Sequence, residues 1–219
     1  MQVAIIDYGS GNLRSAAKAF ERVAQTSGQR IIVTADPTDL VKASHIVLPG
    51  VGAFADCIRG LEAIARMRSA LETQVLKERK PFLGICVGMQ MLFDTGYEHG
   101  IHKGLGWIGG EVLKIAAANN NAQLKIPHMG WNDLQLLSPA HPLLTGIKSG
   151  DHCYFVHSYH AVCKNSSHIL ATTDYGTPLT AIVAKDNIMG TQFHPEKSQQ
   201  AGLRLIENFL KLGIKGLMS

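Results

Sequence analysis

The amino-acid sequence predicts an α/β fold with a mostly parallel central sheet. In the first half of the chain, short apolar runs typical of buried strands alternate with longer segments of helical periodicity. Strands and helices in this order usually form parallel sheets, with the connecting helices packed on both faces. The 219 residues suffice for a sizeable core, and no linker or internal repeat divides them. We therefore expect residues 1–219 to form a single domain.

The first half of the chain contains four predicted strands and two helical regions. The first helical region carries its apolar residues on one face and ends before Gly28, a residue type that often closes helices. The second region is long, and we expect a break near Met67 and an end before Pro81. The predicted strands span residues 3–7, 30–34, 45–48 and 82–85, and the helical regions span 12–27 and 53–79.

The second half shifts to shorter β segments followed by one helix. Residues 116–122 include three consecutive asparagines and are predicted as a polar surface loop, whereas residues 128–132 are expected to form a turn at a strand edge. A final helix should begin at about Ser198 and end at Gly213, with its apolar face toward the core. The predicted strands span residues 111–115, 154–162, 170–173, 179–184 and 188–192.

Composition and charge exclude several classes of function. The net charge of +4 is modest and the basic residues are scattered, which argues against nucleic-acid binding. No apolar run is long enough to span a membrane, and the first residues form a strand pattern without the features of a secretory signal. The four cysteines show no zinc-ligand spacing. We expect no metal site and a reducing, cytoplasmic location.

The glycines at positions 9 and 11 invite comparison with dinucleotide-binding loops. That fingerprint needs a third glycine at position 14, where this chain has Arg14. No acidic residue stands in the usual place at the end of the second predicted strand, although Asp36 is close. We therefore expect no bound nucleotide and no other cofactor.

Cys86 lies in the most informative motif of the chain. Residues 84–88 (GICVG) place this cysteine between two glycines, after a predicted strand and before a helical pattern. This is the arrangement of a nucleophile elbow, a tight and strained turn in which residues two positions from the nucleophile must lack side chains. The following helix would favour the thiolate over the thiol. The alternative is a buried structural cysteine beside two packing glycines.

A cysteine nucleophile needs a base and an acceptor that orients the base. Residues 190–196 (GTQFHPE) follow another predicted strand and supply His194 and Glu196, with Pro195 expected to hold the segment extended. A His-x-Glu pair alone is weak evidence, because most such pairs are solvated surface residues. Together with the elbow, it predicts a catalytic triad of Cys86, His194 and Glu196.

These motifs and residues 49–52 (PGVG), after the third predicted strand, resemble those of the class I glutamine amidotransferases. One branch of the family, the HisH-type glutaminase subunits of imidazole glycerol phosphate synthase, is similar in three further stretches. The resemblance runs from residue 2 to about residue 210. It implies a three-layer, flavodoxin-like α/β fold and the hydrolysis of glutamine to glutamate and ammonia. The three further stretches are residues 7–12 (DYGSGN), 127–132 (PHMGWN) and 154–159 (YFVHSY).

The oxyanion formed during amide hydrolysis needs two hydrogen-bond donors. The backbone N–H of Val87, next after the nucleophile, is one, and we expect the second from residues 50–52, where glycines permit a peptide flip to bring in Val51 or Gly52. The resemblance implies that this loop becomes productive only when a partner is ready. It also implies a set of glutamine-binding residues: Gly50, Gly52, Gln90, Glu98, Ser158 and Tyr159.

The resemblance further implies a second protein that uses the ammonia. The expected partner is a TIM-barrel cyclase of the HisF type, which forms imidazole glycerol phosphate and AICAR in histidine biosynthesis. The two chains would form a heterodimer with an enclosed ammonia route. The residues expected to face the cyclase are Asn12, Met129, Trp131, Asn132, Tyr154 and Lys197.

Two alternatives remain at this stage. The chain could serve a different synthase, such as those that form pyridoxal phosphate, anthranilate or GMP, although residues 127–132 (PHMGWN) argue against this. It could also be another cysteine hydrolase, or a silent binding module on the same fold. A peptidase should cleave peptides without a partner, which separates that alternative experimentally.

Overall fold

The computed structural model describes residues 1–25, 27–116 and 124–213. Most of the predicted loop at 116–122 therefore lies outside the described residues. No helix within the described ranges is long and apolar enough to cross a membrane.

The centre of the structure is a mixed sheet to which eight strands of the described chain contribute. Five neighbouring strands are parallel to one another, and the remaining three are antiparallel. The α/β prediction is therefore confirmed, with the parallel part confined to one side of the sheet. In spatial order the strands are β2 (Arg30–Thr34), β1 (Gln2–Ile6), β3 (His45–Gly50), β4 (Phe82–Cys86), β14 (Ile188–Thr191), β13 (Pro178–Lys185), β12 (Ile169–Asp174) and β9 (Gln135–Leu136).

The register of the parallel strands brings the sequence motifs together. Gly50 at the end of β3 pairs with Cys86 at the end of β4. On the other side of β4, Thr191 of β14 pairs with Ile85. Because the carboxyl ends of parallel strands meet at one edge of a sheet, residues that follow β3, β4 and β14 converge there.

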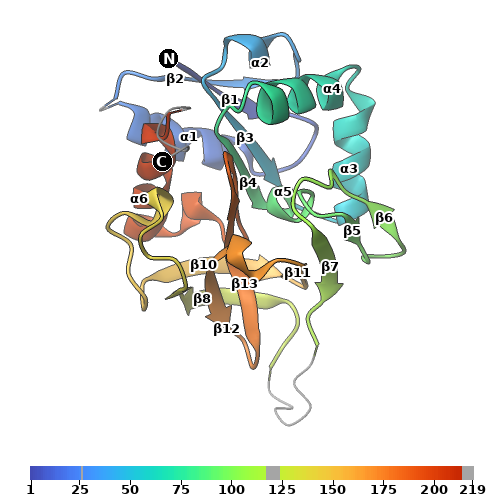
Figure 1. Cartoon of the computed structure of the whole chain (residues 1–219), viewed down its shortest axis with the longest axis vertical. Coiled ribbons are helices and arrows are strands. Elements are labelled where there is room, and N and C mark those ends of the chain that lie inside the picture. Colours follow the sequence, from blue (N-terminus) through green and yellow to red (C-terminus); the bar gives the residue numbers. More distant parts are fainter. Residues whose placement is uncertain (26, 117–123, 214–219) are drawn as a thin grey trace.

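Helices cover both faces of the sheet, as the sequence predicts (Figure 1). On one face, α1 (Leu13–Ala24) packs against α6 (Gln199–Lys211), with Phe20 and Phe209 in edge-to-face contact at 6.3 Å. The other face carries α2 (Asp39–Lys42), α3 (Phe54–Ala63) and α4 (Met67–Leu71).

The predicted helix boundaries hold in the second helical region and differ in the first. Helix α1 ends at Ala24 and not at residue 27, and Gly28, with a φ of +67°, closes the turn that follows by donating its N–H to the Ala24 carbonyl. The long helical region breaks before Met67, where Arg66 adopts a left-handed conformation. Helix α4 then continues into a π-helical turn (Glu72–Lys77) that ends before Pro81.

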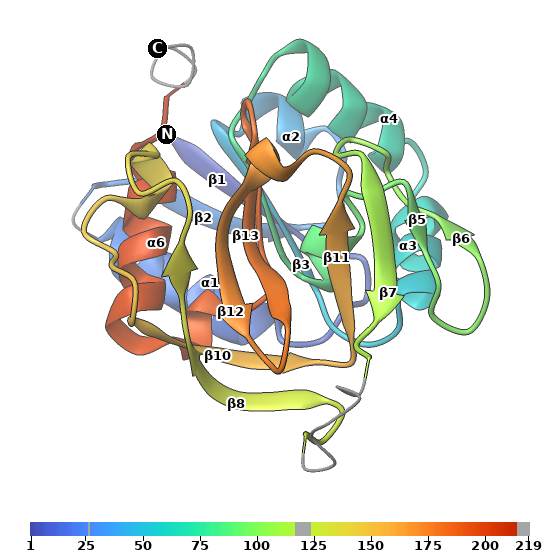
Figure 2. The same cartoon turned by 60° about the horizontal axis from the view of Figure 1, so that its bottom comes forward.

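The predicted strand at 154–162 is wrong, because the chain changes sheets at Ser158. Strand β10 (His152–His157) pairs only with β8 (His128–Asp133) within the described sheets, so residues 128–132 form a strand where a turn was expected. Figure 2 shows this ribbon beneath the main sheet. After Ser158, the chain enters a four-stranded sheet in the order β11 (Tyr159–Cys163), β7 (Gly110–Lys114), β5 (Thr95–Gly96) and β6 (His102–Lys103).

Candidate active site

Cys86 occupies a strained turn between β4 and the single-turn helix α5 (Val87–Gln90). Its φ and ψ angles are 56° and −112°, outside the regions that an L-residue normally adopts. The two flanking glycines meet backbone directly: a Cβ at Gly84 would lie 2.5 Å from the oxygen of Gly88, and one at Gly88 would lie 1.8 Å from the oxygen of Leu48. The expected elbow geometry is thus present at this position. Helix α5 is shorter than the sequence pattern indicated, so its dipole contributes less than expected.

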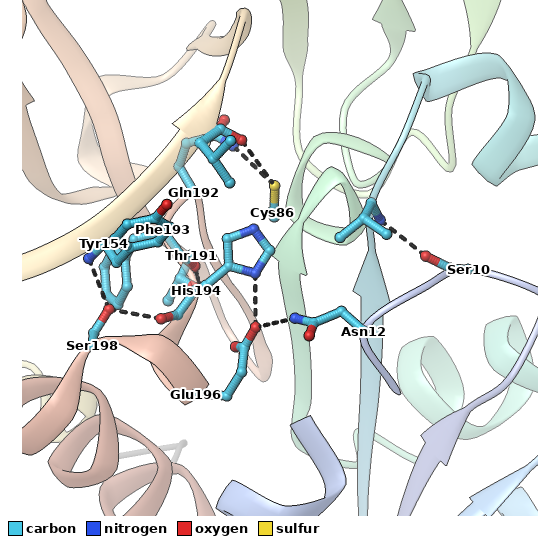
Figure 3. A network of polar contacts seen from close by, with 12 residues as sticks. Ser10, Asn12, Cys86, Tyr154, Thr191, Gln192, Phe193, His194, Glu196 and Ser198 are labelled. Atoms are coloured by element: carbon cyan, nitrogen blue, oxygen red, sulfur yellow. Dashed lines mark hydrogen bonds and ion pairs between the residues drawn. The ribbon is translucent and has the colours of Figure 1, made fainter. Parts of the chain in front are cut away.

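His194 and Glu196 come together in a turn that follows β14. Pro195 begins a 3₁₀ turn (Pro195–Lys197), so the segment is not extended as the sequence suggested. The turn places the two side chains side by side, with His194 Nδ1 and Glu196 Oε1 2.8 Å apart and both side chains buried. The other ring nitrogen, Nε2, points toward the Cys86 sulfur and has no hydrogen-bond partner among the described residues (Figure 3).

Three segments hold this turn in place. Asn12, in the loop between β1 and α1, donates its side-chain amide to the same Glu196 oxygen that bonds His194. Ser198 donates its hydroxyl to the His194 carbonyl at 2.7 Å and accepts the Tyr154 N–H at 3.0 Å. The sequence placed Asn12 only on the partner surface and gave Ser198 no role beyond a helix start. These contacts connect residues far apart in the chain, which sequence spacing does not reveal.

The environment of His194 favours its protonated form. Burial by itself lowers the pKa of this imidazole, but its interactions with Cys86 and Glu196 outweigh burial and raise the pKa to about 9. An imidazolium next to the nucleophile is ready to give a proton to a leaving group.

A pocket of about 290 Å³ opens beside Cys86 and His194. Most residues predicted to bind glutamine or its oxyanion line it, and Gly50 does not. Gly50 lies behind the elbow, where a Cβ would be 2.5 Å from the Gly88 nitrogen. The predicted residues that line the pocket are Val51, Gly52, Val87, Gln90, Glu98, Ser158 and Tyr159.

Two of these side chains are held by backbone groups. Gln90 donates its amide to the Tyr159 carbonyl at 2.9 Å and to Gln192 Oε1 at 3.0 Å. Glu98 accepts the N–H of Phe54, at the start of α3, at 2.8 Å. The motifs of the sequence assign no role to Gln192, although its Nε2 atom lies 3.8 Å from the Cys86 sulfur. Its position two residues before His194 is the one feature of the sequence that could have indicated that Gln192 lies at the site.

The backbone N–H of Val51 already has an acceptor outside the pocket lining. It donates to the Ser10 hydroxyl at 2.9 Å. The Val51 carbonyl accepts from the Cys57 thiol at 3.5 Å, and Gly52 has a φ of +99°. In this conformation Val51 does not supply an oxyanion donor.

The sequence profile described as "Glutamine amidotransferase class-I" matches residues 4–212. The chain belongs to the class I glutamine amidotransferase family. A relative from Rhodospirillum rubrum, named "Imidazole glycerol phosphate synthase subunit HisH", is 57% identical over 96% of this chain and 99% of its own length. Relatives with the same name from Brucella suis and Cereibacter sphaeroides are 56% and 52% identical, with coverage of 96% of this chain and 99% and 98% of theirs.

Solved structures show the same fold at low sequence identity. One titled "Crystal structure of glutamine amidotransferase" superimposes with a TM-score of 0.71 at 18% identity and covers 95% of this chain and 97% of that one. A glutamine amidotransferase from Thermotoga maritima gives a TM-score of 0.63 at 17% identity, covering 96% and 82%. The three-layer amidotransferase fold is therefore confirmed.

In this amidotransferase, most residues expected at a partner surface gather beside the triad. On β8, Met129 and Trp131 are 61% and 48% exposed. Tyr154 lies opposite Trp131 in the β8–β10 ribbon, with their rings 5.9 Å apart, and Lys197 Nζ lies 5.6 Å from the centre of the Tyr154 ring. Asn132 is tied to the Asp174 carbonyl and to His128.

A larger groove of about 1060 Å³ runs along α1 and α6 and includes Trp131 and Arg204. Its lining includes none of Cys86, His194 and Glu196, the predicted triad. Within the described residues, no group of three or more histidine, cysteine, aspartate or glutamate side chains is arranged to hold a metal ion.

Replacing Gly88 with alanine should destabilise the protein strongly. The new Cβ would clash with the Leu48 carbonyl, and both partners are backbone, so neither can move freely. We expect a loss of more than about 3 kcal/mol in the free energy of unfolding, measured by urea denaturation. A matched Gly213→Ala variant meets nothing within 4 Å and should change stability by less than about 0.5 kcal/mol. Equal stabilities of the two variants would contradict the close packing at the elbow.

The charged form of His194 should make stability depend on pH. Its pKa of about 9 lies above the ordinary value of 6.5, so proton binding stabilises the folded state fully below about pH 6.5 and this contribution is lost as the pH rises through 9. The free energy of unfolding of the wild type should therefore exceed that of His194→Gln by the largest amount near pH 6. This difference should shrink toward pH 9.5. A difference that is constant with pH would show that folding does not raise the pKa of His194.

Proposed function

We propose that this chain is the glutaminase subunit of imidazole glycerol phosphate synthase. It hydrolyses L-glutamine to glutamate and ammonia and passes the ammonia to a cyclase subunit. The observation that carries the proposal is the strained Cys86 facing His194, which bonds Glu196, at the carboxyl edge of an amidotransferase sheet. Relatives that are 52–57% identical over nearly the whole chain bear the HisH name.

The arrangement supports a covalent mechanism. The Cys86 sulfur, having passed its proton to His194, attacks the side-chain amide carbon of glutamine and forms a tetrahedral oxyanion. The carbon–nitrogen bond breaks as His194 gives its proton to the departing nitrogen, which leaves a γ-glutamyl thioester and ammonia. His194 then takes a proton from water, the resulting hydroxide attacks the thioester, and the sulfur leaves as glutamate forms. Glu196 fixes the ring tautomer and stabilises the imidazolium throughout.

The pocket offers polar groups to both ends of glutamine. We propose that Gln90 and Glu98 meet its α-amino and carboxylate end, and that the backbone at Ser158 and Tyr159 helps to hold it, since all four residues line the pocket. Gly52 lies on the same wall. Gly50 contributes by permitting the close packing behind Cys86 rather than by direct contact.

The oxyanion hole is incomplete until the loop after β3 changes conformation. Val87 provides one donor from the start of α5, and a flip of the Val51–Gly52 region brings in the second. The hydrogen bond from Val51 to Ser10 opposes that change. Turnover of glutamine is therefore slow until another event favours the flipped loop.

A partner subunit is implied by the HisH name of the relatives, and we propose that it is a TIM-barrel cyclase of the HisF type. The exposed Met129 and Trp131, with Tyr154 and Lys197 beside them, form the docking surface in this proposal, and Asn12 and Asn132 lie at its margin. The cyclase incorporates the ammonia to form imidazole glycerol phosphate and AICAR.

We further propose that residues 1–219 are one domain of a cytoplasmic heterodimer, which agrees with one continuous core and four unpaired cysteines.

The test is glutamate release from glutamine by the purified chain, alone and with a HisF-type cyclase that carries imidazole glycerol phosphate. We expect very slow release alone, strong stimulation in the complex, and loss of activity by more than about a thousandfold in Cys86→Ala. The matched control is Cys163→Ala, which removes a thiol outside the pocket and should retain activity. High activity without the partner, or none with it, would contradict the assignment.

Substituting Ser10 with alanine should raise the activity of the isolated chain. The change removes the acceptor of the Val51 N–H, a bond worth about 1 kcal/mol, and so favours the flipped loop by roughly fivefold. Initial rates of glutamate release without a partner measure the effect. Ser10→Thr keeps a hydroxyl and should behave like the wild type. If Ser10→Ala is no faster than Ser10→Thr, this hydrogen bond does not restrain the loop.

A further inference from the structure

Two buried histidines lie between the exposed face of β8 and the glutaminase pocket. His128 and His157 are directly opposite each other in the β8–β10 ribbon, with His128 Nδ1 and His157 Nε2 2.9 Å apart. Both side chains are buried, and His157 lines the pocket beside Cys86. The mechanism proposed above uses neither of them.

The hydrogen bonds fix which nitrogen of each ring carries the proton. The Tyr159 carbonyl can only accept, so His157 Nδ1 donates to it at 2.8 Å. In a neutral ring Nε2 is then an acceptor, and His128 Nδ1 must donate to it. His128 Nε2 in turn accepts from the Asn132 amide at 3.2 Å, and that amide also donates to the Asp174 carbonyl at 2.7 Å. In this series of hydrogen bonds, from Asn132 to the Tyr159 carbonyl, each donor has an acceptor only if both histidine rings are neutral.

Burial keeps the rings neutral. It lowers the pKa of His128 to about 4 and that of His157 to about 3. Interactions with His128, His160 and His194 lower the pKa of His157 further. The His128 ring is also held by stacking, since it lies 4.8 Å from Phe155 and 4.1 Å from Tyr175.

The chain of bonds continues from His157 to the nucleophile. The Tyr159 carbonyl that accepts from His157 also accepts from Gln90. Gln90 bonds Gln192, whose amide lies 3.8 Å from the Cys86 sulfur. His157 thus bonds the polypeptide backbone where it passes from β10 to β11, at the Ser158–Tyr159 wall of the pocket.

The other end of the chain is at the surface. Side chains alternate across a strand, so His128 points inward while its neighbours Met129 and Trp131 point outward, where they are 61% and 48% exposed. Among the described sheets, β8 pairs with β10 alone. A shift of β8 is therefore passed first to β10, its one strand partner among the described sheets.

We propose that His128 and His157 are positioning residues that transmit contact on the outer face of β8 to the wall of the glutaminase pocket. This inference rests on the proposed function, because it requires a partner on β8 and glutamine hydrolysis in the pocket. Docking shifts the ribbon, and the neutral histidine pair carries the shift to Tyr159, Gln90 and the surroundings of Cys86.

The decisive variant is His128→Phe, which keeps an aromatic ring for stacking but removes the hydrogen bond to His157. We expect the isolated chain to release glutamate within twofold of the wild-type rate. In the complex with a HisF-type cyclase and imidazole glycerol phosphate, the stimulated kcat should fall at least tenfold. Affinity for the cyclase, measured by titration, should change less than threefold. His128→Asn restores a donor at the Nδ1 position and should recover part of the loss.

The matched control is His160→Phe, which alters a neighbouring histidine outside the hydrogen-bonded chain and should keep full stimulation. A ratio of stimulated to basal rate that is unchanged in folded His128→Phe would overturn the inference. If the wild type itself shows no stimulation by the cyclase, the proposed function fails instead. A purely structural role would lower basal and stimulated rates together, which would also count against transmission.

A second measurement needs no substitution and applies if His128→Phe does not fold. In ¹⁵N-histidine-labelled wild type at neutral pH, both rings should show the neutral form with the proton on Nδ1. Adding the cyclase should shift the signals of His128 and His157 and leave those of His160 in place. Charged rings, or signals that do not respond to the cyclase, would refute the role of the pair.

Discussion

The structure depends on backbone meeting backbone behind the nucleophile. Three glycines, Gly50, Gly84 and Gly88, allow the start of α5 to lie directly against the ends of β3 and β4. Any side chain at these positions would separate the elbow from the strands that support it. The strain stored at Cys86 persists because this packing permits no other path for the chain. The position of the Cys86 sulfur is therefore set by the backbone packing of the elbow against the sheet and not by contacts of the Cys86 side chain.

The acid–base half of the site is assembled differently, from side chains of distant segments. His194 and Glu196 share a short turn, but that turn is held by Asn12 from the first loop and by Ser198, which bonds Tyr154 of β10. The two halves meet only because β14 lies next to β4 in the sheet. Strand β10 is therefore bonded through Tyr154 and Ser198 to the turn that holds His194, whereas Cys86 is supported by the sheet.

The sequence predicts local features well where one segment determines them. The parallel strands, the elbow and the left-handed turn at Gly28 follow from apolar runs and glycine positions, and the structure has them there. The division of residues 154–162 at Ser158 was not predictable, because neither glycine nor proline marks it and the two halves differ only in their partners, β8 and β7. The roles of Gln192 and Asn12 were missed for the same reason, since their contacts are made by the fold. The single turn of α5 shows that an apolar pattern alone does not set helix length.

The loop between β1 and α1 reaches two places at once. Ser10 holds the peptide that would face the negative oxygen of the tetrahedral intermediate, and Asn12, two residues later, holds the carboxylate behind the positive imidazole. One short segment thus contacts both the peptide that would stabilise the negative oxyanion and the carboxylate that stabilises the positive imidazolium. A displacement of that segment by about 1 Å would weaken the Ser10 and Asn12 hydrogen bonds together. Substitutions in this segment must therefore satisfy two separate electrostatic requirements at once.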